Sequence, residues 1–261
     1  MLSDILARNI NLLDYLRKLD KELPVNTNYI VLKGACLIIS GILSPKEREM
    51  SDIDLLIKDE DLIFFEKAFS NMGFSKLPYS KKSFFKPMKN APPIIFDIHL
   101  SLRHTKNTSN LFEKAETLEG KAKKLSYEDN LLHIISHAFL HHGFMEEKEI
   151  IDIKKLCFFL LSEGILHKTI KKAAQKAAQE NIYFLFALGL KKTFAIQAPS
   201  ELFSLKEKLF SNFPEFLERR KSVFSQYIFE ALYCPKTLFL RFIYYPINKL
   251  ELIFSRQDKA L

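Results

Sequence analysis

The stretch Ser51-Asp-Ile-Asp-Leu-Leu-Ile57 sets two aspartates two residues apart in an otherwise apolar run. Side chains alternate between the two faces of a β-strand, so Asp52 and Asp54 are predicted to point to the same face. Two carboxylates this close raise each other's proton affinity unless a cation neutralises them, and their hard oxygens favour Mg²⁺ or Mn²⁺. Because an unpaired charge in a buried strand is costly, we interpret the pair as a candidate metal site.

A third carboxylate, Asp97, lies in a second apolar run, Pro93-Ile-Ile-Phe-Asp-Ile-His-Leu100. If this strand lies beside the first, three aspartates on two strands can hold the two-metal clamp used for in-line phosphoryl transfer. His99 shares a strand face with Asp97 and is therefore a further candidate for the site. The other D-x-D in the chain, Asp59-Glu-Asp61, is interpreted as the solvated start of a helix.

The segment upstream, Val31-Leu-Lys-Gly-Ala-Cys36, is predicted to pass from a strand into a helix through Lys33-Gly34-Ala35. Backbone N–H groups at the start of such a helix, together with its dipole, would face any phosphate nearby. Arg48 could add a contact to this phosphate. An exposed charge between two glutamates is the alternative interpretation of Arg48.

Apolar spacing predicts the other elements of the chain. The expected helices cover residues 3–20, ending near Pro24, residues 34–43, and a segment capped by Asp59 that runs to Met72. Two or three further strands are predicted between residues 73 and 100. From about residue 110 to the end, apolar residues recur every three or four positions, which predicts an all-helical second part.

The composition indicates a globular protein and argues against several nucleotide-binding classes. Of the 261 residues, 48% are hydrophobic, 27% are charged and only 7 are glycine. The glycines form neither a G-x-G-x-x-G motif nor a G-x-x-x-x-G-K-[ST] motif, which disfavours Rossmann dehydrogenases, P-loop ATPases and protein kinases. The net charge of +8 is spread along the chain and favours a phosphate, whether of a nucleotide, a nucleic acid or a lipid headgroup.

The cysteines and the lack of a targeting signal predict a cytoplasmic protein. Cys36, Cys157 and Cys234 have no C-x-x-C spacing, so neither a disulfide framework nor a cysteine-based zinc site is expected. No apolar stretch reaches the roughly 20 residues of a membrane span, and no cleavable leader is recognisable. A soluble protein without a transmembrane segment is the expectation.

Six of the 7 histidines lie between residues 99 and 142. His133, His137 and His141 have the spacing of one stripe on a helix. The stripe lacks the glutamate of H-E-x-x-H. We interpret it as a polar seam where the helix meets the catalytic part or the acceptor, rather than as a dedicated zinc site.

The 24 Phe and 9 Tyr are predicted to fill the core, since the chain contains no Trp, rather than to form a base-stacking platform. In the helical half they cluster at Phe158-Phe159, Tyr183-Phe-Leu-Phe186 and Phe239–Tyr245. Basic residues accompany the last cluster between residues 236 and 249. Peripheral contact of this segment with a membrane surface is a secondary alternative.

The chain resembles the uncharacterised nucleotidyltransferase family of the DNA polymerase beta-like superfamily over roughly residues 29 to 160. The resemblance is carried by an ordered set of motifs: Leu32-Lys-Gly-Ala35, Arg48-x-x-Ser-Asp-Ile-Asp-Leu-Leu-Ile57, Phe96-Asp-Ile-His99, Leu125-Ser-x-Glu-Asp-x-Leu-Leu132, His137 and Ile151-Asp-Ile153. The ordered set is far more specific than any one of its pieces.

The resemblance implies a role for each matching residue. Asp52 and Asp54 would bind two Mg²⁺ ions and the phosphates of a nucleoside triphosphate (NTP), and Asp97 would complete the second metal site and help deprotonate the acceptor hydroxyl. The nucleotide-binding positions would be Lys33, Gly34, Ala35, Arg48 and Ser51, of which Lys33-Gly34-Ala35 falls where the superfamily has Gly-Ser. His99 and His137 would lie near the acceptor or support the site from behind.

Together these observations predict an α+β protein with a small mixed sheet flanked by helices and followed by an all-helical part. The expected division is an N-terminal helix over residues 1–23, a nucleotidyltransferase domain over 24–108 and a helical domain over 109–261. The expected reaction is Mg²⁺-dependent transfer of a nucleotidyl group from an NTP to a hydroxyl, with pyrophosphate leaving. The acceptor stays open among a small molecule, a peptide or protein, and an RNA.

Two alternatives to this reaction stay open. The same metal site could transfer a different phosphate-activated group, because the metals recognise phosphate and not the rest of the donor. The chain could also be an NTP-binding or antitoxin-like partner protein without turnover.

Overall fold

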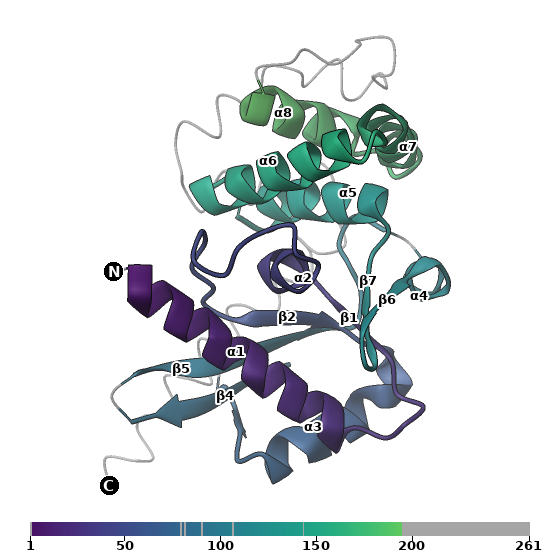
Figure 1. The fold of residues 1–261 in the computed structure, drawn as a ribbon. Helices are drawn as coiled ribbons and strands as arrows, with labels where there is room; N and C mark the ends of the chain where they lie inside the picture. The colour runs from purple at the N-terminus through teal and green to yellow at the C-terminus, as the bar shows by residue number, and fades with distance from the viewer. Residues whose placement is uncertain are drawn as a thin grey trace, which may run out of the picture.

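The computed structural model describes residues 2–194, except for Tyr79, Lys81, Asn90, Lys106 and Gly143. Figure 1 shows a sheet covered by helices, with a layer of further helices above it. The predicted features that lie outside the described residues are Cys234, the aromatic run Phe239–Tyr245, the basic segment 236–249 and any helix beyond Phe194.

A mixed sheet of seven strands forms the centre of the described region, in the order β3-β4-β5-β2-β1-β7-β6. The strands are β1 (Tyr29–Val31), β2 (Ile53–Leu56), β3 (Ser75–Lys76), β4 (Ser83–Met88), β5 (Ala91–His99), β6 (Glu116–Glu119) and β7 (Ala122–Lys124). β2 runs parallel to β5 and antiparallel to β1, and β1 runs parallel to β7. The strand that contains Asp54 therefore lies in the middle of the sheet, where both of its neighbours fix its position, and Asp52 lies one residue before this strand.

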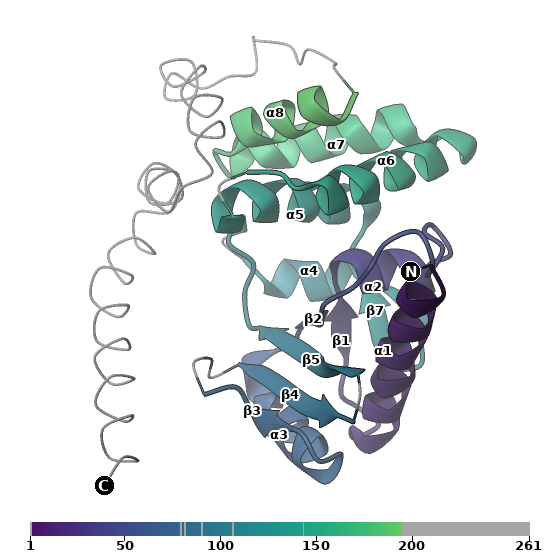
Figure 2. The same ribbon diagram turned by 90° about the vertical axis from the view of Figure 1, so that its left-hand side faces the viewer.

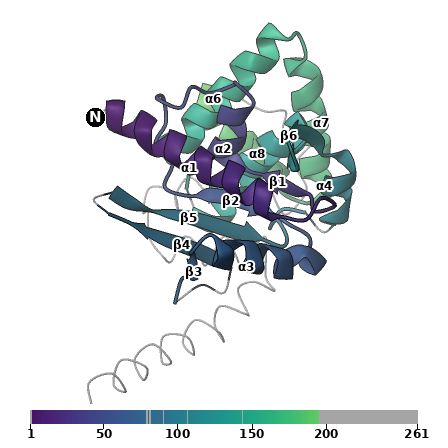
Figure 3. The same cartoon turned by 60° about the horizontal axis from the view of Figure 1, so that its bottom comes forward.

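The helices enclose this sheet and continue beyond it. They are α1 (Leu2–Glu22), α2 (Lys33–Ile39), the 3₁₀ turn η1 (Asp59–Asp61), α3 (Leu62–Asn71), α4 (Ser109–Lys114), α5 (Tyr127–His137), the π-turn η2 (Ala138–His142), α6 (Glu147–Ser162), α7 (Leu166–Gln179) and α8 (Tyr183–Phe194). Figures 1 and 2 show α5 to α8 packed together as a group, called the helical layer below, with α2 between this group and the sheet. Figures 2 and 3 show α3 beside β3 and β4, away from that layer.

The structure confirms the predicted fold class, an α+β fold in which a mixed β-sheet is flanked and followed by helices. It differs from the prediction over the hairpin β6–β7, which falls in the part expected to be wholly helical and instead extends the sheet beside β1. Both strands are short, and Ala122 is their only buried residue, so the hairpin carries little of the apolar alternation that marks a strand. We retain the division near residues 23 and 108 as a proposal.

Two predicted helix limits are also corrected. The helix expected over residues 34–43 ends at Ile39, and Gly41 follows with φ +71°, the left-handed conformation typical of helix ends. Asp59 does not cap a helix, because Asp59–Asp61 forms a 3₁₀ turn and α3 begins at Leu62. The turn keeps these carboxylates at the surface, which agrees with the prediction that this D-x-D is solvated.

Aromatic rings fill much of the core. Phe69 of α3 stacks on Phe84 with ring centroids 4.4 Å apart and lies 5.1 Å from Phe96, which fixes the helix against β4 and β5. The predicted core cluster of Tyr183–Phe186 is buried. The prediction is wrong for Phe158, which is 61% exposed on α6. Among the described helices, none is both long and apolar enough to cross a membrane.

Candidate active site

The residues predicted for the site come together around one cavity of about 260 Å³. The cavity is lined by Asp52, Asp54, Asp97, Lys33, Gly34, Ala35, Arg48, Ser51, His99 and His137, which are all of the residues predicted for the site. Its lining also includes Leu32, Glu49, His141, His142, Lys148 and Glu149. Of these, only His141 belongs to the predicted histidine stripe, and no sequence pattern marks Lys148 or Glu149 as neighbours of the aspartates.

The register of β2 and β5 brings the carboxylates to one face. Asp54 pairs with Asp97, and Leu56 pairs with His99, in a parallel ladder. Their neighbours along both strands, such as Ile53 and Phe96, are fully buried in the core. The apolar alternation thus anchors both strands from behind and leaves Asp54, Asp97 and His99 on the cavity side.

Asp54 is the most tightly held of the three aspartates. The Nζ of Lys33 donates a hydrogen bond to its Oδ1 at 2.8 Å, and Nε2 of His99 lies 2.8 Å from the same oxygen. Burial by itself would raise the pKa of this carboxyl, but Lys33 and His99 outweigh it and hold the pKa of Asp54 well below its usual value. Asp54 is therefore ionised throughout the neutral range.

The other two aspartates each accept a hydrogen bond from a serine. The hydroxyl of Ser51 donates to Asp52 Oδ1 at 2.9 Å, and the hydroxyl of Ser83 on β4 donates to Asp97. Burial and the neighbouring charge of Asp54 raise the pKa of Asp52. Ser83 has no sequence signal, because its approach to Asp97 depends on the pairing of β4 with β5.

The carboxylate face has the chemistry of a site for a hard divalent ion. Single ligand atoms of Asp54, Asp97 and His99 lie within 4.8 Å of one another. Carboxylate oxygens are the ligands that Mg²⁺ and Mn²⁺ prefer. The raised pKa of Asp52 also reflects a repulsion between carboxylates that a cation would relieve. Lys33 supplies part of that positive charge in this structure.

Arg48 is held in the cavity wall by the helical layer. Its Nε lies 2.9 Å from Oδ1 of Asp152 on α6, and both side chains are almost fully buried. The alternative of an exposed charge is therefore wrong. Burial raises the pKa of Asp152 to about 7, although Arg48 opposes the shift. A Cβ on Gly34 would lie 2.7 Å from the Cζ of Arg48, so only a glycine leaves room for the guanidinium there.

The loop that carries Arg48 and Asp52 is fixed by α1. The side-chain amide of Asn9, which is fully buried, donates to the carbonyls of Pro45 and Arg48 at 2.6 Å each. Its Oδ1 accepts a hydrogen bond from the Met50 backbone at 3.0 Å. Asn9 therefore helps to position the site without lining it, and an isolated polar residue in a helix gives no signal of this role in the sequence.

Histidines line the side of the cavity that belongs to the helical layer. The π-turn after α5 sets His141 and His142 beside His137, with ring centroids 4.8 and 5.1 Å from the His137 ring. Burial and then the charge of Lys33 lower the pKa of His137. His133, one turn earlier, is buried, and neither of its ring nitrogens has a hydrogen-bond partner among the described residues.

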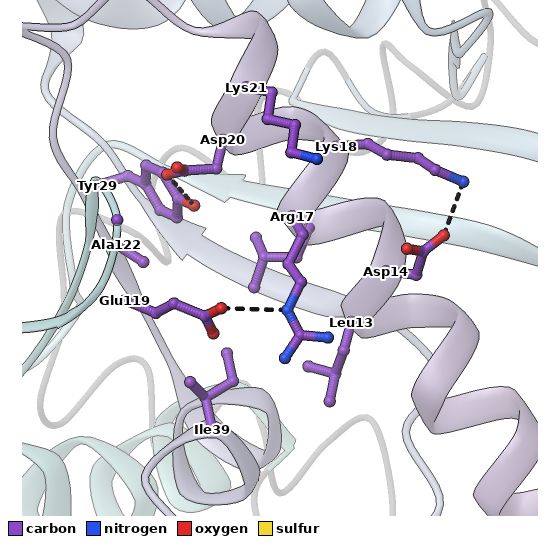
Figure 4. A pocket seen from close by; sticks show the side chains of 12 residues that line it. Leu13, Asp14, Arg17, Lys18, Asp20, Lys21, Tyr29, Ile39, Glu119 and Ala122 are labelled. Carbon is purple, nitrogen blue, oxygen red and sulfur yellow. Dashed lines mark hydrogen bonds and ion pairs between the residues drawn. The ribbon is translucent and has the colours of Figure 1, made fainter.

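A second hollow, of about 310 Å³, lies along α1 and has none of the predicted site residues in its lining. Arg17 pairs with Glu119 at 3.2 Å, and the Tyr29 hydroxyl donates to Asp20 at 3.0 Å. Figure 4 shows both interactions as dashed lines. These polar groups of its lining are thus used in holding α1 against the sheet. The cavity with the carboxylates is the candidate active site.

Comparison with known proteins assigns the family. The uncharacterised nucleotidyltransferase family matches residues 2–194, and the chain belongs to this family. The reaction class of this family is nucleotidyl transfer. No curated protein matches the chain.

Two solved structures are similar to part of the chain. One is the solution structure of the antibiotic-resistance factor ANT(2'')-Ia, with 16% identity, a TM-score of 0.42 and coverage of 66% of this chain and 94% of that chain. The other is the crystal structure of ANT(2")-Ia in complex with adenylyl-2"-tobramycin, with 14% identity, a TM-score of 0.44 and coverage of 66% and 98%.

Proposed function

We propose that the chain transfers a nucleotidyl group from an NTP to a hydroxyl of an acceptor molecule, releases pyrophosphate and depends on Mg²⁺ or Mn²⁺. The observation that carries this proposal is the shared face of Asp52, Asp54 and Asp97 at one cavity. Membership of the nucleotidyltransferase family supports it. The acceptor class stays open among small molecules, peptides or proteins, and RNA.

In this proposal each part of the cavity has a task. A divalent ion held by Asp52, Asp54 and Asp97 would neutralise the triphosphate and lower the pKa of the acceptor hydroxyl. Asp97, on β5 beside Asp54, would receive the proton of the acceptor hydroxyl. Lys33 and Arg48 would bind phosphate oxygens, with Gly34 leaving the room that Arg48 needs.

Labelling with nucleotides tests the proposed activity. We expect the purified protein, incubated with each α-labelled NTP, Mg²⁺ and a cell extract, to transfer label to a defined species and release pyrophosphate. The double variant Asp52→Asn/Asp54→Asn should lose at least a thousandfold in labelling, because it removes two charges that would hold the ion. Asp59→Asn/Asp61→Asn, at the surface D-x-D, is the matched control and should label normally.

Calorimetry separates the alternatives. If the wild type binds Mg²⁺-NTP but labels nothing, the chain is a nucleotide-binding protein without turnover. If NTP affinity is unchanged by EDTA and by the Asp52/Asp54 double variant, the metal-dependent proposal fails. Labelling by a phosphate-activated donor other than an NTP would instead support the alternative of a different transferred group.

A further inference from the structure

The histidines on the helical side of the cavity form a compact cluster that the proposed reaction does not use. His137 is the last residue of α5, and His141 and His142 lie in the π-turn Ala138–His142 that follows it. A π-turn bonds residue i to i+5, which is wider than the i to i+4 of an α-helix. Residues four and five positions after His137 are thereby both brought beside it, which a regular α-helix would not do.

The spacing of the three rings is that of imidazoles around one ion. With a Zn–N bond of about 2.1 Å and tetrahedral angles, three imidazoles on one zinc ion have ring centres about 5 Å apart. In this structure the centroids are 4.8 Å apart for His137 and His141, 5.1 Å for His137 and His142, and 4.8 Å for His141 and His142. All three distances between ring centroids agree with binding to one ion. Three histidines along one face of a regular helix would instead place the first and last rings far apart.

The ligand atoms are also within reach of one ion. One nitrogen from each ring lies within 4.8 Å of the other two, which is close enough for a shared ion to draw the three together. All three side chains line the cavity and remain partly accessible, which gives an ion a path of entry. A three-histidine set leaves one tetrahedral position open towards the cavity.

We propose that His137, His141 and His142 form a second metal site, which binds a borderline transition ion such as Zn²⁺. It differs in chemistry from the carboxylate face opposite, because imidazole nitrogens favour Zn²⁺, Co²⁺ and Ni²⁺ whereas carboxylates favour Mg²⁺ and Mn²⁺. The site revises the expectation for the stripe His133, His137 and His141, because the π-turn adds His142 and leaves His133 in the buried interior. The glutamate of H-E-x-x-H is not needed for such a set.

Zinc titration of the full chain, stripped with a chelator, free of nucleotide and kept in a large excess of Mg²⁺ that occupies the carboxylate face, tests the site. We expect one equivalent of Zn²⁺ per chain, and a loss of affinity of at least tenfold in His142→Ala. His167→Ala, which changes an exposed histidine on α7, is the control and should bind as the wild type does. Asp52→Asn/Asp54→Asn should keep the full equivalent, because the carboxylates belong to the other site.

X-ray absorption of the zinc-loaded wild type counts the ligands without any variant, so a misfolded His142→Ala protein leaves the proposal testable. Three imidazole nitrogens would support it. The proposal is overturned if fewer than three imidazoles are found, if stoichiometric Zn²⁺ binding is lost in the Asp52/Asp54 double variant, or if a folded His142→Ala protein keeps its affinity.

Discussion

Asp97 shows how much depends on a single side chain at this site. It faces Asp54 across the parallel ladder and accepts a hydrogen bond from Ser83, so its carboxylate is oriented from the side opposite the other two aspartates. The alternation of polar and apolar residues predicts that Asp97 and His99 share a face. It cannot predict that Asp97 pairs with Asp54, because the register of two strands far apart in sequence is set by tertiary packing.

Asp97→Asn should separate nucleotide binding from turnover. We expect affinity for Mg²⁺-NTP to stay within about tenfold, or about 1.4 kcal/mol, because Asp52 and Asp54 remain. Labelling should fall by about a thousandfold or more, since the variant removes the proposed proton acceptor. Calorimetry and the labelling assay measure the two effects, and circular dichroism checks the fold. Full activity would exclude Asp97 from the reaction, and lost affinity would assign it to nucleotide binding.

At the scale of elements, the loop between α2 and β2 is organised by a helix far from it in sequence. Asn9 forms hydrogen bonds with three backbone groups of this loop. Its neighbour Arg8 donates to the carbonyls of Met50 and Ser51 at 2.6 and 3.0 Å. The periodicity of α1 predicts the helix but not this contact, because an amphipathic pattern identifies a buried face without identifying its partner.

Asn9→Ala should loosen the loop and the site together. Three backbone groups, one buried and two partly buried, would lose their partner, so we expect the free energy of unfolding to fall by about 1–3 kcal/mol. NTP affinity should fall as well, because Arg48 and Asp52 lie on the loop. Urea denaturation and calorimetry measure these effects. Asn71→Ala, at the exposed end of α3, is the control. A destabilised variant with unchanged NTP affinity would show that the loop does not position nucleotide-binding groups.

Sequence patterns missed two elements, each for its own physical reason. The π-turn η2 is not predicted, because the histidine spacing matches the period of an α-helix and the wider π-turn forms only when the chain is folded. The hairpin β6–β7 is missed because its strands are short and charged residues such as Lys123 and Lys124 occupy most of β7, which leaves no apolar alternation to recognise. By contrast, β2 and β5 combine buried apolar residues with the aspartates, and there the pattern predicts both element and face.

For the whole molecule, one buried ion pair joins the helical layer to the loop before β2. Arg48 comes from the loop before β2 and Asp152 from α6. Since burial raises the pKa of Asp152 from 3.8 to about 7, the folded state holds a proton that the unfolded state releases at lower pH. The contribution of Asp152 to stability is therefore greatest below about pH 4 and declines as the pH rises towards 7.

Comparing wild type with Asp152→Asn at several pH values should isolate this contribution. Between about pH 4 and 7 the wild type should lose stability relative to the variant, by at most about 1.4 kcal/mol per pH unit for one proton. Urea denaturation across this range measures the difference. Glu163→Gln, an exposed substitution at the end of α6, should show no such relative slope. A difference between wild type and Asp152→Asn that stays constant with pH would contradict a raised pKa.

The parallel pairing of β1 with β7 has a consequence for the order in which the chain is made. The segment from β1 to β5 leaves the ribosome early and already contains all three aspartates, but the second neighbour of β1 arrives only with Ala122–Lys124. Until then β1 presents a row of unpaired backbone groups, which can serve as a template for another nascent chain. A fragment that stops before residue 122 would keep this edge open permanently, so the carboxylate-bearing half is expected to aggregate when it is produced by itself.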